Sequence, residues 1–399
     1  MKQKITDKNA KILIATDCLR TINNIFMETF FLAFLFKYSR YDIRAIGIYH
    51  VLAYATMIFM AYFTGNLVKR GNRILMYRMG IIVTFFYMVL FVILKENIVN
   101  FLPLCGVIYG IKVALRAFPY NLIVADNVTA DKMIAFKGCV ESLKSGLKIG
   151  VPVLLGAFFS YGSYFSTVTA LTVISAVEFL LFVLIKAPIR KNAARFSIPV
   201  YWRRTKKISV IKDLYRLEIC RGMTIDGTLA TLVTLYVVYL FHTDFKLGVV
   251  TSCFFAVAVI MNGLFARFGK YHQFKSILFM IASASLISVM LFIFLPNQGT
   301  FILYNFCFTV AVQLLRAIAD INMFNLSNSD EIRRYKNEYF AVREIFLNAG
   351  RIISYLLLVV IGCSNNLAMV KYLLIFLTVI LALMCYMCMV VNRKLRTNS

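Results

Sequence analysis

The chain has 399 residues, of which 61% are hydrophobic and 16% are charged, and its mean hydropathy is +0.77. A soluble domain of this size cannot bury so much apolar surface, so a water-soluble globular fold is excluded and the expected solvent is lipid. The formal net charge is +26, but the cations collect between apolar runs, which argues against a nucleic-acid-binding face.

Twelve apolar runs, each bounded by charged or turn residues, follow one another along the chain. A bilayer core about 30 Å thick needs roughly 20 apolar residues per helical span, and the runs have that length. We therefore predict an all-α membrane protein with transmembrane helices near 12–36, 45–66, 74–94, 99–122, 140–161, 165–186, 214–241, 247–266, 276–295, 300–322, 342–362 and 369–391.

The first run follows a basic N-terminal segment but contains Asp17, Arg20 and Glu28 and lacks a small-residue cleavage site. We therefore expect a retained helix and not a signal peptide. If the N-terminus is cytoplasmic, most Lys and Arg lie in inner segments, and the outer loops carry only Lys37, Arg40, Arg44, Lys95, Lys246 and Lys371. This bias predicts that both termini are cytoplasmic. The richness in Ile, Lys, Asn, Phe and Tyr fits a bacterial cytoplasmic membrane.

The largest inner segment, 187–213, divides the chain into an N-terminal half at 1–186 and a C-terminal half at 214–399. It is basic and holds the single Trp202 beside Arg203 and Arg204. Two interpretations stay open for it: a linker that only enforces topology, or an interfacial helix that contacts anionic lipids.

The two halves resemble each other at an offset near 200 residues, and the matching positions are mostly polar residues within apolar runs. Chance matches of that kind are rare, so the chain is expected to be a duplicated six-helix unit, an organisation typical of secondary transporters. The matches pair Asp17 and Arg20 with Glu218 and Arg221, Gly65 with Gly263, Arg116 with Arg316, Glu141 with Glu344, and Lys148 with Arg351.

The segment after the second span carries Gly65, Arg70 and Arg73, and Gly263 begins a similar segment after the eighth span. Over essentially its whole length the chain resembles the major facilitator superfamily, whose motif places an Asp where this chain has Lys69. The resemblance implies two pseudo-symmetric six-helix halves in which spans 1, 4, 7 and 10 line a central cavity. The resemblance implies a gating role for Gly65, Arg70 and Arg73, which match the motif, but not for Lys69 at the position of the Asp.

Charged residues inside the spans are costly, at roughly 2.5–3.5 kcal/mol each at mid-bilayer, so they must face a cavity or one another. At 100° per residue, one face of the first span collects Asp17, Arg20, Thr21, Asn24 and Glu28. The nine cysteines are scattered and indicate neither a disulfide framework nor a metal centre. No cofactor is expected.

Two further pairs lie one helical turn apart. Arg316 and Asp320 can form an internal salt bridge, whereas Lys112 and Arg116 are both positive and are expected to need an external anion. By position, the predicted substrate or proton contacts are Glu28, Asp226, Arg116, Arg316, Lys112, Asn24 and Asp320. The predicted gating or salt-bridge residues are Asp17, Arg20, Glu141, Lys148, Glu218, Arg221, Glu344, Arg351, Gly65, Arg70, Arg73 and Gly263. The alternative for each residue is a purely structural ion pair.

The chain has no ATP-binding loop and no Ser/His, Cys/His or metal constellation, so we expect no enzymatic activity. We predict a monomeric secondary active transporter that moves a small organic solute, anionic or amphipathic, by alternating access. Protons are the expected coupling ion, with another ion as the alternative, and import and efflux both stay open. The alternative from another class is a receptor or accessory protein that keeps the fold without transport.

Overall fold

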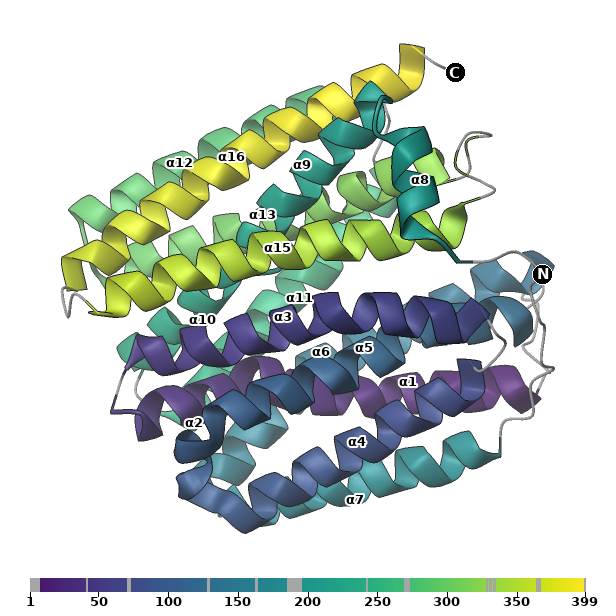
Figure 1. Cartoon of the computed structure of the whole chain (residues 1–399). Coiled ribbons are helices and arrows are strands. Elements are labelled where there is room, and N and C mark those ends of the chain that lie inside the picture. The colour runs from purple at the N-terminus through teal and green to yellow at the C-terminus, as the bar shows by residue number, and fades with distance from the viewer. Residues whose placement is uncertain are drawn as a thin grey trace. The chain divides into compact units, whose positions relative to one another are not determined.

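The computed structural model describes residues 8–40, 42–69, 73–127, 130–161, 164–184, 196–241, 243–268, 273–327, 329, 332, 335–363 and 367–397. All regular elements in these ranges are helices (Figure 1). The N-terminal ones are α1 (Lys8–Ile25), η1 (Phe26–Phe30), α2 (Phe31–Tyr38), α3 (Ile43–Lys69), α4 (Arg73–Leu94), η2 (Lys95–Phe101), α5 (Leu102–Asn127), α6 (Ala130–Tyr161) and α7 (Tyr164–Val183). The C-terminal ones are α8 (Ile198–Thr205), α9 (Ser209–Met223), α10 (Thr228–Phe241), α11 (Asp244–Phe268), α12 (Phe274–Phe294), α13 (Gln298–Ser327), α15 (Lys336–Cys363) and α16 (Leu367–Thr397).

The described residues contain eleven apolar helical segments long enough to cross a membrane. One of them, Arg73–Ala117, runs over both α4 and α5 and so contains two of the predicted spans. The predicted all-α fold with twelve spans is confirmed. Several helices extend beyond the predicted runs, as α6 and α15 do at their N-terminal ends, because hydropathy marks the lipid-exposed part of a helix and not its end.

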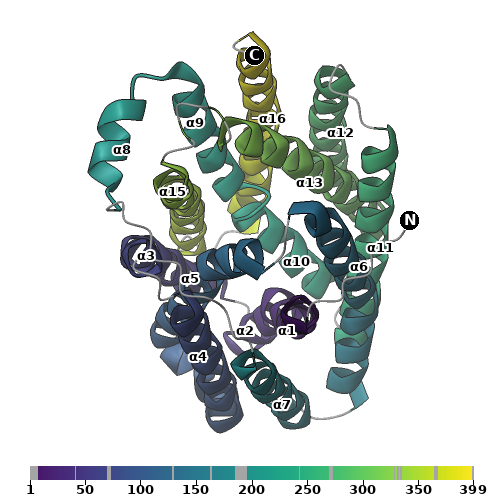
Figure 2. The same ribbon diagram turned by 90° about the vertical axis from the view of Figure 1, so that its right-hand side faces the viewer.

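The chain divides into two compact units, and each is described by itself. Unit 1 holds Met1–Arg195 and Val237–Phe255, and unit 2 holds Phe196–Tyr236 and Ala256–Ser399. In unit 1, α5 packs against α3 and α4, α4 also packs against α7, and α1 packs against α6 and α7 (Figure 2). A buried core cluster joins these helices through Leu13, Tyr77, Ile81, Tyr120 and Phe182, among others.

Unit 2 repeats this packing with the equivalent helices. There α9 packs against α15 and α16, and α12 packs against α13 and α16. These four pairs correspond to α1 with α6 and α7, and to α4 with α5 and α7, in unit 1. The internal repeat that the polar residues indicated is therefore also a repeat of helix packing.

Residues 237–255 come from the second half of the sequence but pack within unit 1. Lys37 Nζ lies 2.7 Å from Asp244 Oδ1, and the Tyr161 and Phe245 rings are in contact. Gly156 and Gly248 let the backbones of α6 and α11 approach closely, since a Cβ on Gly248 would lie 2.3 Å from the carbonyl oxygen of Pro152. The end of α10 and the start of α11 are thus held by an ion pair and by close backbone packing.

The short helix α8 lies within the basic segment 187–213. Ser197 caps it by accepting a hydrogen bond from the Val200 amide, and Pro199 occupies its first turn, where the missing N–H costs nothing. Tyr201 and Tyr215 share a hydrogen bond between their hydroxyls, and the partly exposed Trp202 stacks on Tyr215. The part of this segment that the structure describes is therefore mostly helical, and its contact with anionic lipids stays a prediction.

Candidate functional site

The helix of the first span is irregular near its middle. Residues Phe26–Phe30 form one π-helical turn, in which the Phe31 amide donates to the Phe26 carbonyl. The flanking side chains of Met27 and Thr29 are buried, whereas Glu28 is exposed. Single π-helical turns inside α-helices are rare and are frequent at functional sites. The predicted proton contact Glu28 therefore lies on an unusual backbone segment.

The seventh span is interrupted between α9 and α10. Thr224 ends α9, its hydroxyl donates to the Cys220 carbonyl, and the amides of Thr224 and Asp226 both donate to the Arg221 carbonyl. Gly227 is needed here, because a Cβ at this position would lie 1.8 Å from the carbonyl oxygen of Gly222. Asp226 thus lies in a break in a membrane helix, a feature by which transporters expose backbone and side chains to substrates and ions.

The two irregular segments lie at matching places in the repeat. Asp17 matches Glu218, so the break at 224–227 corresponds to 23–26 and overlaps the start of the π-helical turn. Glu28 and Asp226 are thus close to equivalent positions of the two units. Both acids were predicted from the sequence, but apart from Gly227 no residue there marks the backbone irregularity around them.

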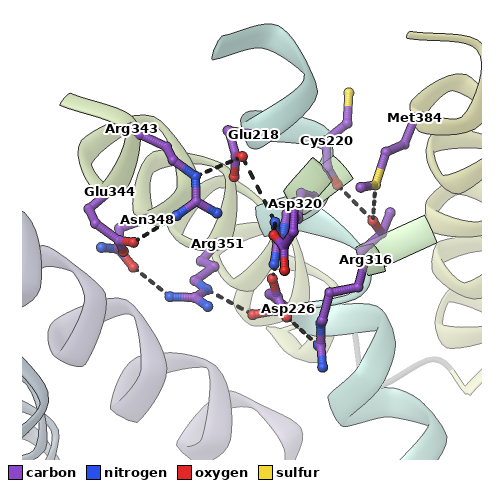
Figure 3. Close-up of polar contacts among 12 residues, drawn as sticks. Glu218, Cys220, Asp226, Arg316, Asp320, Arg343, Glu344, Asn348, Arg351 and Met384 are labelled. Atoms are coloured by element: carbon purple, nitrogen blue, oxygen red, sulfur yellow. Dashed lines mark hydrogen bonds and ion pairs between the residues drawn. The ribbon is translucent and has the colours of Figure 1, made fainter. Parts of the chain in front are cut away.

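A cluster of charged side chains surrounds the break in unit 2 (Figure 3). Arg221 Nε lies 2.6 Å from Asp226 Oδ2, and Arg221 Nη1 lies 2.7 Å from Asp320 Oδ1. Arg316 Nη2 pairs with the other oxygen of Asp226. Asp226 is therefore held between two arginines. The expected Arg316–Asp320 pair within α13 is wrong in this structure, since each residue binds a partner from the α9–α10 segment.

The cluster continues along α15. Arg343 Nε lies 2.8 Å from Oε1 of the fully buried Glu218, and its Nη1 lies 3.2 Å from the more exposed Glu344. Arg351 Nε donates to the Asp226 carbonyl at 2.8 Å, and its Nη1 donates to Asn348 Oδ1. Arg351 thus satisfies a backbone carbonyl within the helix break. Asn348 and Arg343 were not among the predicted site residues.

Two glycines bring α9 and α15 close enough for these bonds. A Cβ at Gly222 would lie 2.1 Å from the carbonyl oxygen of Leu347, and one at Gly350 would lie 2.1 Å from that of Ile219. Since neither backbone oxygen can move aside cheaply, only glycine fits at these positions. In the sequence, this close approach of α9 and α15 is marked by a glycine beside charged residues in each helix, Gly222 after Arg221 and Gly350 before Arg351.

In unit 1, Asp17 is fully buried and binds two cations. Arg20 pairs with Asp17 Oδ1, and Lys144 Nζ lies 2.6 Å from Asp17 Oδ2. The Arg20 guanidinium also lies 4.4 Å from the centre of the Tyr120 ring. The predicted salt-bridge residues Asp17 and Arg20 are thus brought together, and Lys144 is a partner that the sequence alone did not single out.

Arg116 is buried and pairs with Glu178 of α7, and its Nη1 donates to Thr84 Oγ1 at 2.9 Å. The expectation that Arg116 needs an external anion is therefore wrong, because a partner lies on a neighbouring helix. Gly80 of α4 makes room, since a Cβ there would lie 2.5 Å from Arg116 Cγ. Glu178 was not among the predicted site residues, although a single acid in an apolar span was a signal for it.

Lys112 lies one turn before Arg116 on α5 and is 2% exposed. Its Nζ has no hydrogen-bond partner in the part of the chain that the structure describes. The amine lies 5.6 Å from the centre of the Tyr87 ring and 5.1 Å from that of Tyr109. Glu28 lies within electrostatic range of it.

The other predicted residues lie apart from these clusters or outside the described residues. Asn24 and Lys148 are half-buried on their helices. Gly65 and Gly263 lie inside α3 and α11, so the expected loops after spans 2 and 8 begin later than predicted. Arg73 is the first residue of α4. Arg70 lies outside the described residues, as does the side chain of Glu141.

Comparisons with known proteins find one related sequence and several solved structures with the same fold. No family model matches the chain. The uncharacterized protein YqgE of Bacillus subtilis is 21% identical over 356 residues, which cover 88% of this chain and 82% of YqgE.

Three solved structures share the fold over nearly the whole chain. A bacterial homologue of the iron transporter ferroportin in an inward-facing state aligns with a TM-score of 0.72 and 13% identity, covering 98% of this chain and 100% of its own. A mutant of the nucleoside transporter NupG aligns with a TM-score of 0.71 and 11% identity, covering 96% and 98%. A bacterial homologue of the human lysosomal transporter Spinster aligns with a TM-score of 0.64 and 10% identity, covering 99% of both chains.

These structures all have the fold of the major facilitator superfamily, and the chain shares it. The three are named as transporters or as homologues of transporters. Their substrates differ widely, so the fold carries no information on what this chain moves.

Proposed function

We propose that this chain is a proton-coupled secondary transporter that moves a small organic solute across the cytoplasmic membrane of a bacterium by alternating access. The observation that carries the proposal is the pair of acids, Glu28 and Asp226, on irregular helix segments at matching places of the two repeats. Shared fold with transporters of iron and nucleosides supports a transport role.

Of the two acids, Glu28 is the better proton carrier. Asp226 forms ion pairs with Arg221 and Arg316, and both arginines favour the charged form of its carboxylate. Glu28 is exposed on the π-helical turn and lies within electrostatic range of the Lys112 amine, so that its surroundings can change when the protein changes conformation. A carboxylate whose environment alternates can bind a proton in one state and release it in the other.

The test is solute-dependent proton flux in liposomes that contain the purified protein and the pH-sensitive dye pyranine. Amino acids, nucleosides, sugars, aromatic carboxylates and drug-like amines would be added in turn at the outer face. We expect at least one class to change the internal pH with the wild-type protein. Glu28→Gln should abolish this change, whereas Glu96→Gln, which neutralises an exposed acid in η2, should leave it intact.

Solute accumulation that is unaffected by the pH gradient and by Glu28→Gln would refute the proposed proton coupling. No flux of any solute, together with saturable binding of one of them, would favour the receptor alternative.

A further inference from the structure

Lys112 is a buried lysine without a hydrogen-bonded counter-ion among the described residues. Its amine has no hydrogen-bond partner among the described residues and is 2% exposed. The Tyr87 and Tyr109 rings lie within cation–π distance of it. This attraction is smaller than the cost of removing an ammonium group from water, so the amine lacks the counter-charge that an anion at this place would supply.

Three other cations of the interior of unit 1 are in ion pairs with acids. Arg116 is paired with Glu178, and Arg20 and Lys144 share Asp17. In the cluster of unit 2, four acids face four arginines: Glu218, Asp226, Asp320 and Glu344 with Arg221, Arg316, Arg343 and Arg351. Among these interior cations, the Lys112 amine is the one without a hydrogen-bond partner in the part of the chain that the structure describes.

The surroundings of the amine are aromatic. The Tyr87 hydroxyl shares a hydrogen bond of 3.1 Å with that of Tyr49, and the Tyr87 ring packs on Phe91 at 4.5 Å between centroids. Phe91 in turn stacks on Phe31 of α2. These rings are buried and packed on one another, so the apolar or aromatic body of a solute would contact them only in a conformation that opens this region. A lysine is a single point charge on a flexible stem, so it suits either a carboxylate or a phosphate monoester.

We propose that Lys112 binds the anionic group of the transported solute, and that this solute is an organic anion with an aromatic or apolar body. The inference rests on the proposed transport function and adds the class of substrate. The ammonium group would leave the two tyrosine rings and meet the anion beside Glu28. A proton on Glu28 removes the repulsion between its carboxylate and the incoming anion, so proton and solute bind together.

The experiment measures the thermal unfolding midpoint of the full-length protein in detergent with millimolar benzoate, phenyl phosphate or benzamide. Benzoate and phenyl phosphate carry the two candidate anionic groups on the same ring, and benzamide is the neutral counterpart of benzoate. We expect one or both anions to raise the midpoint by a few degrees and benzamide to leave it unchanged. The anion that acts identifies the chemical group.

Lys112→Met should lose the anion-dependent rise, and Lys112→Arg should keep part of it. Lys246→Met, which removes an exposed lysine of the same charge, should behave as the wild type. Equal stabilisation by benzamide, full retention in Lys112→Met, or no effect of either anion on the wild type would overturn the proposal.

If Lys112→Met does not fold, the proposal is tested by comparing the midpoint shifts caused by benzoate and by benzamide in the wild type and in Lys112→Arg. The pyranine assay for proton flux separates this proposal from the proposed function. Flux with neutral or cationic solutes and none with the anions would refute the role of Lys112 and leave the transporter.

Discussion

Arg116 and Arg316 occupy equivalent positions in the two repeats, but their guanidinium groups bind acids from non-equivalent helices. Arg116 pairs with Glu178 on α7, a helix without a break, whereas Arg316 pairs with Asp226 in the interruption between α9 and α10. The first arginine is therefore part of a fixed interior, and the second is tied to an irregular segment. We expect changes at the first to act on stability and changes around the second to act on transport as well.

Arg116→Met should destabilise the protein by about 3–5 kcal/mol, because it leaves the fully buried Glu178 without a counter-charge. The double variant Arg116→Met with Glu178→Leu should recover much of this loss, since no buried charge then remains. Arg216→Met is the control, because that side chain is 65% exposed and should contribute at most about 1 kcal/mol. Thermal unfolding of the four proteins measures the effect, and equal loss in the single and double variants would contradict it.

Glu28→Gln and Asp226→Asn should differ in their effect on stability. Glu28 is exposed, so its neutralisation should leave the unfolding midpoint nearly unchanged while it removes proton coupling. Asp226→Asn should lower the free energy of unfolding by about 3 kcal/mol or more, because Arg221 and Arg316 lose their shared acid. Unfolding midpoints and proton flux, measured on the same preparations, test both parts. A stable Asp226→Asn protein would show that the two arginines find other partners.

Gly350→Ala should destabilise the packing of α9 against α15, because the added Cβ would lie 2.1 Å from the carbonyl oxygen of Ile219. Overpacking of this kind typically costs about 1–3 kcal/mol. Gly146→Ala is the matched control on α6, since nothing lies within 4 Å of a Cβ there, and it should be neutral or stabilising by up to about 1 kcal/mol. Unfolding midpoints that fall equally in both variants would exclude a specific close contact at Gly350.

The effects of mutations at Lys37 and Asp244 on stability should not be additive when the two charges are exchanged. Lys37→Asp and Asp244→Lys each place like charges beside each other and should lower the unfolding midpoint, whereas the double exchange should restore most of it. The coupling energy of a half-buried pair is expected at about 1 kcal/mol. Additive losses in the double exchange would mean that the pair contributes no interaction energy.

Much of the fold could be predicted from the sequence, because lipid demands long apolar helices and the repeat fixes their order. The intramembrane charges were also recognisable, since each is costly unless it is paired. Their partners were less predictable. Helical periodicity places Arg316 and Asp320 on one face of α13, yet each binds the α9–α10 segment, and only the three-dimensional packing brings that segment near.

Backbone irregularities left no comparable signal in the sequence. The sequence around the π-helical turn at Phe26–Phe30 contains no Gly or Pro, and the break before Thr228 is marked only by Gly227. Similarly, Glu178 could be seen as a single acid in an apolar span, but its match with Arg116 depends on the contact of α4, α5 and α7. Helical periodicity shows on which face of a helix a residue lies. Which other helix packs against that face is determined by the tertiary structure.

The assignment of residues 237–255 to unit 1 has a consequence for the covalent connectivity. The chain passes from one unit to the other at Arg195–Phe196, again within α10, and a third time within α11. A single protease cut after Arg195 would therefore leave two fragments that still share a unit, with Asp244 and Gly248 of the later fragment packed among helices of the earlier one. Such a nicked protein should migrate as one particle in mild detergent and separate only on unfolding.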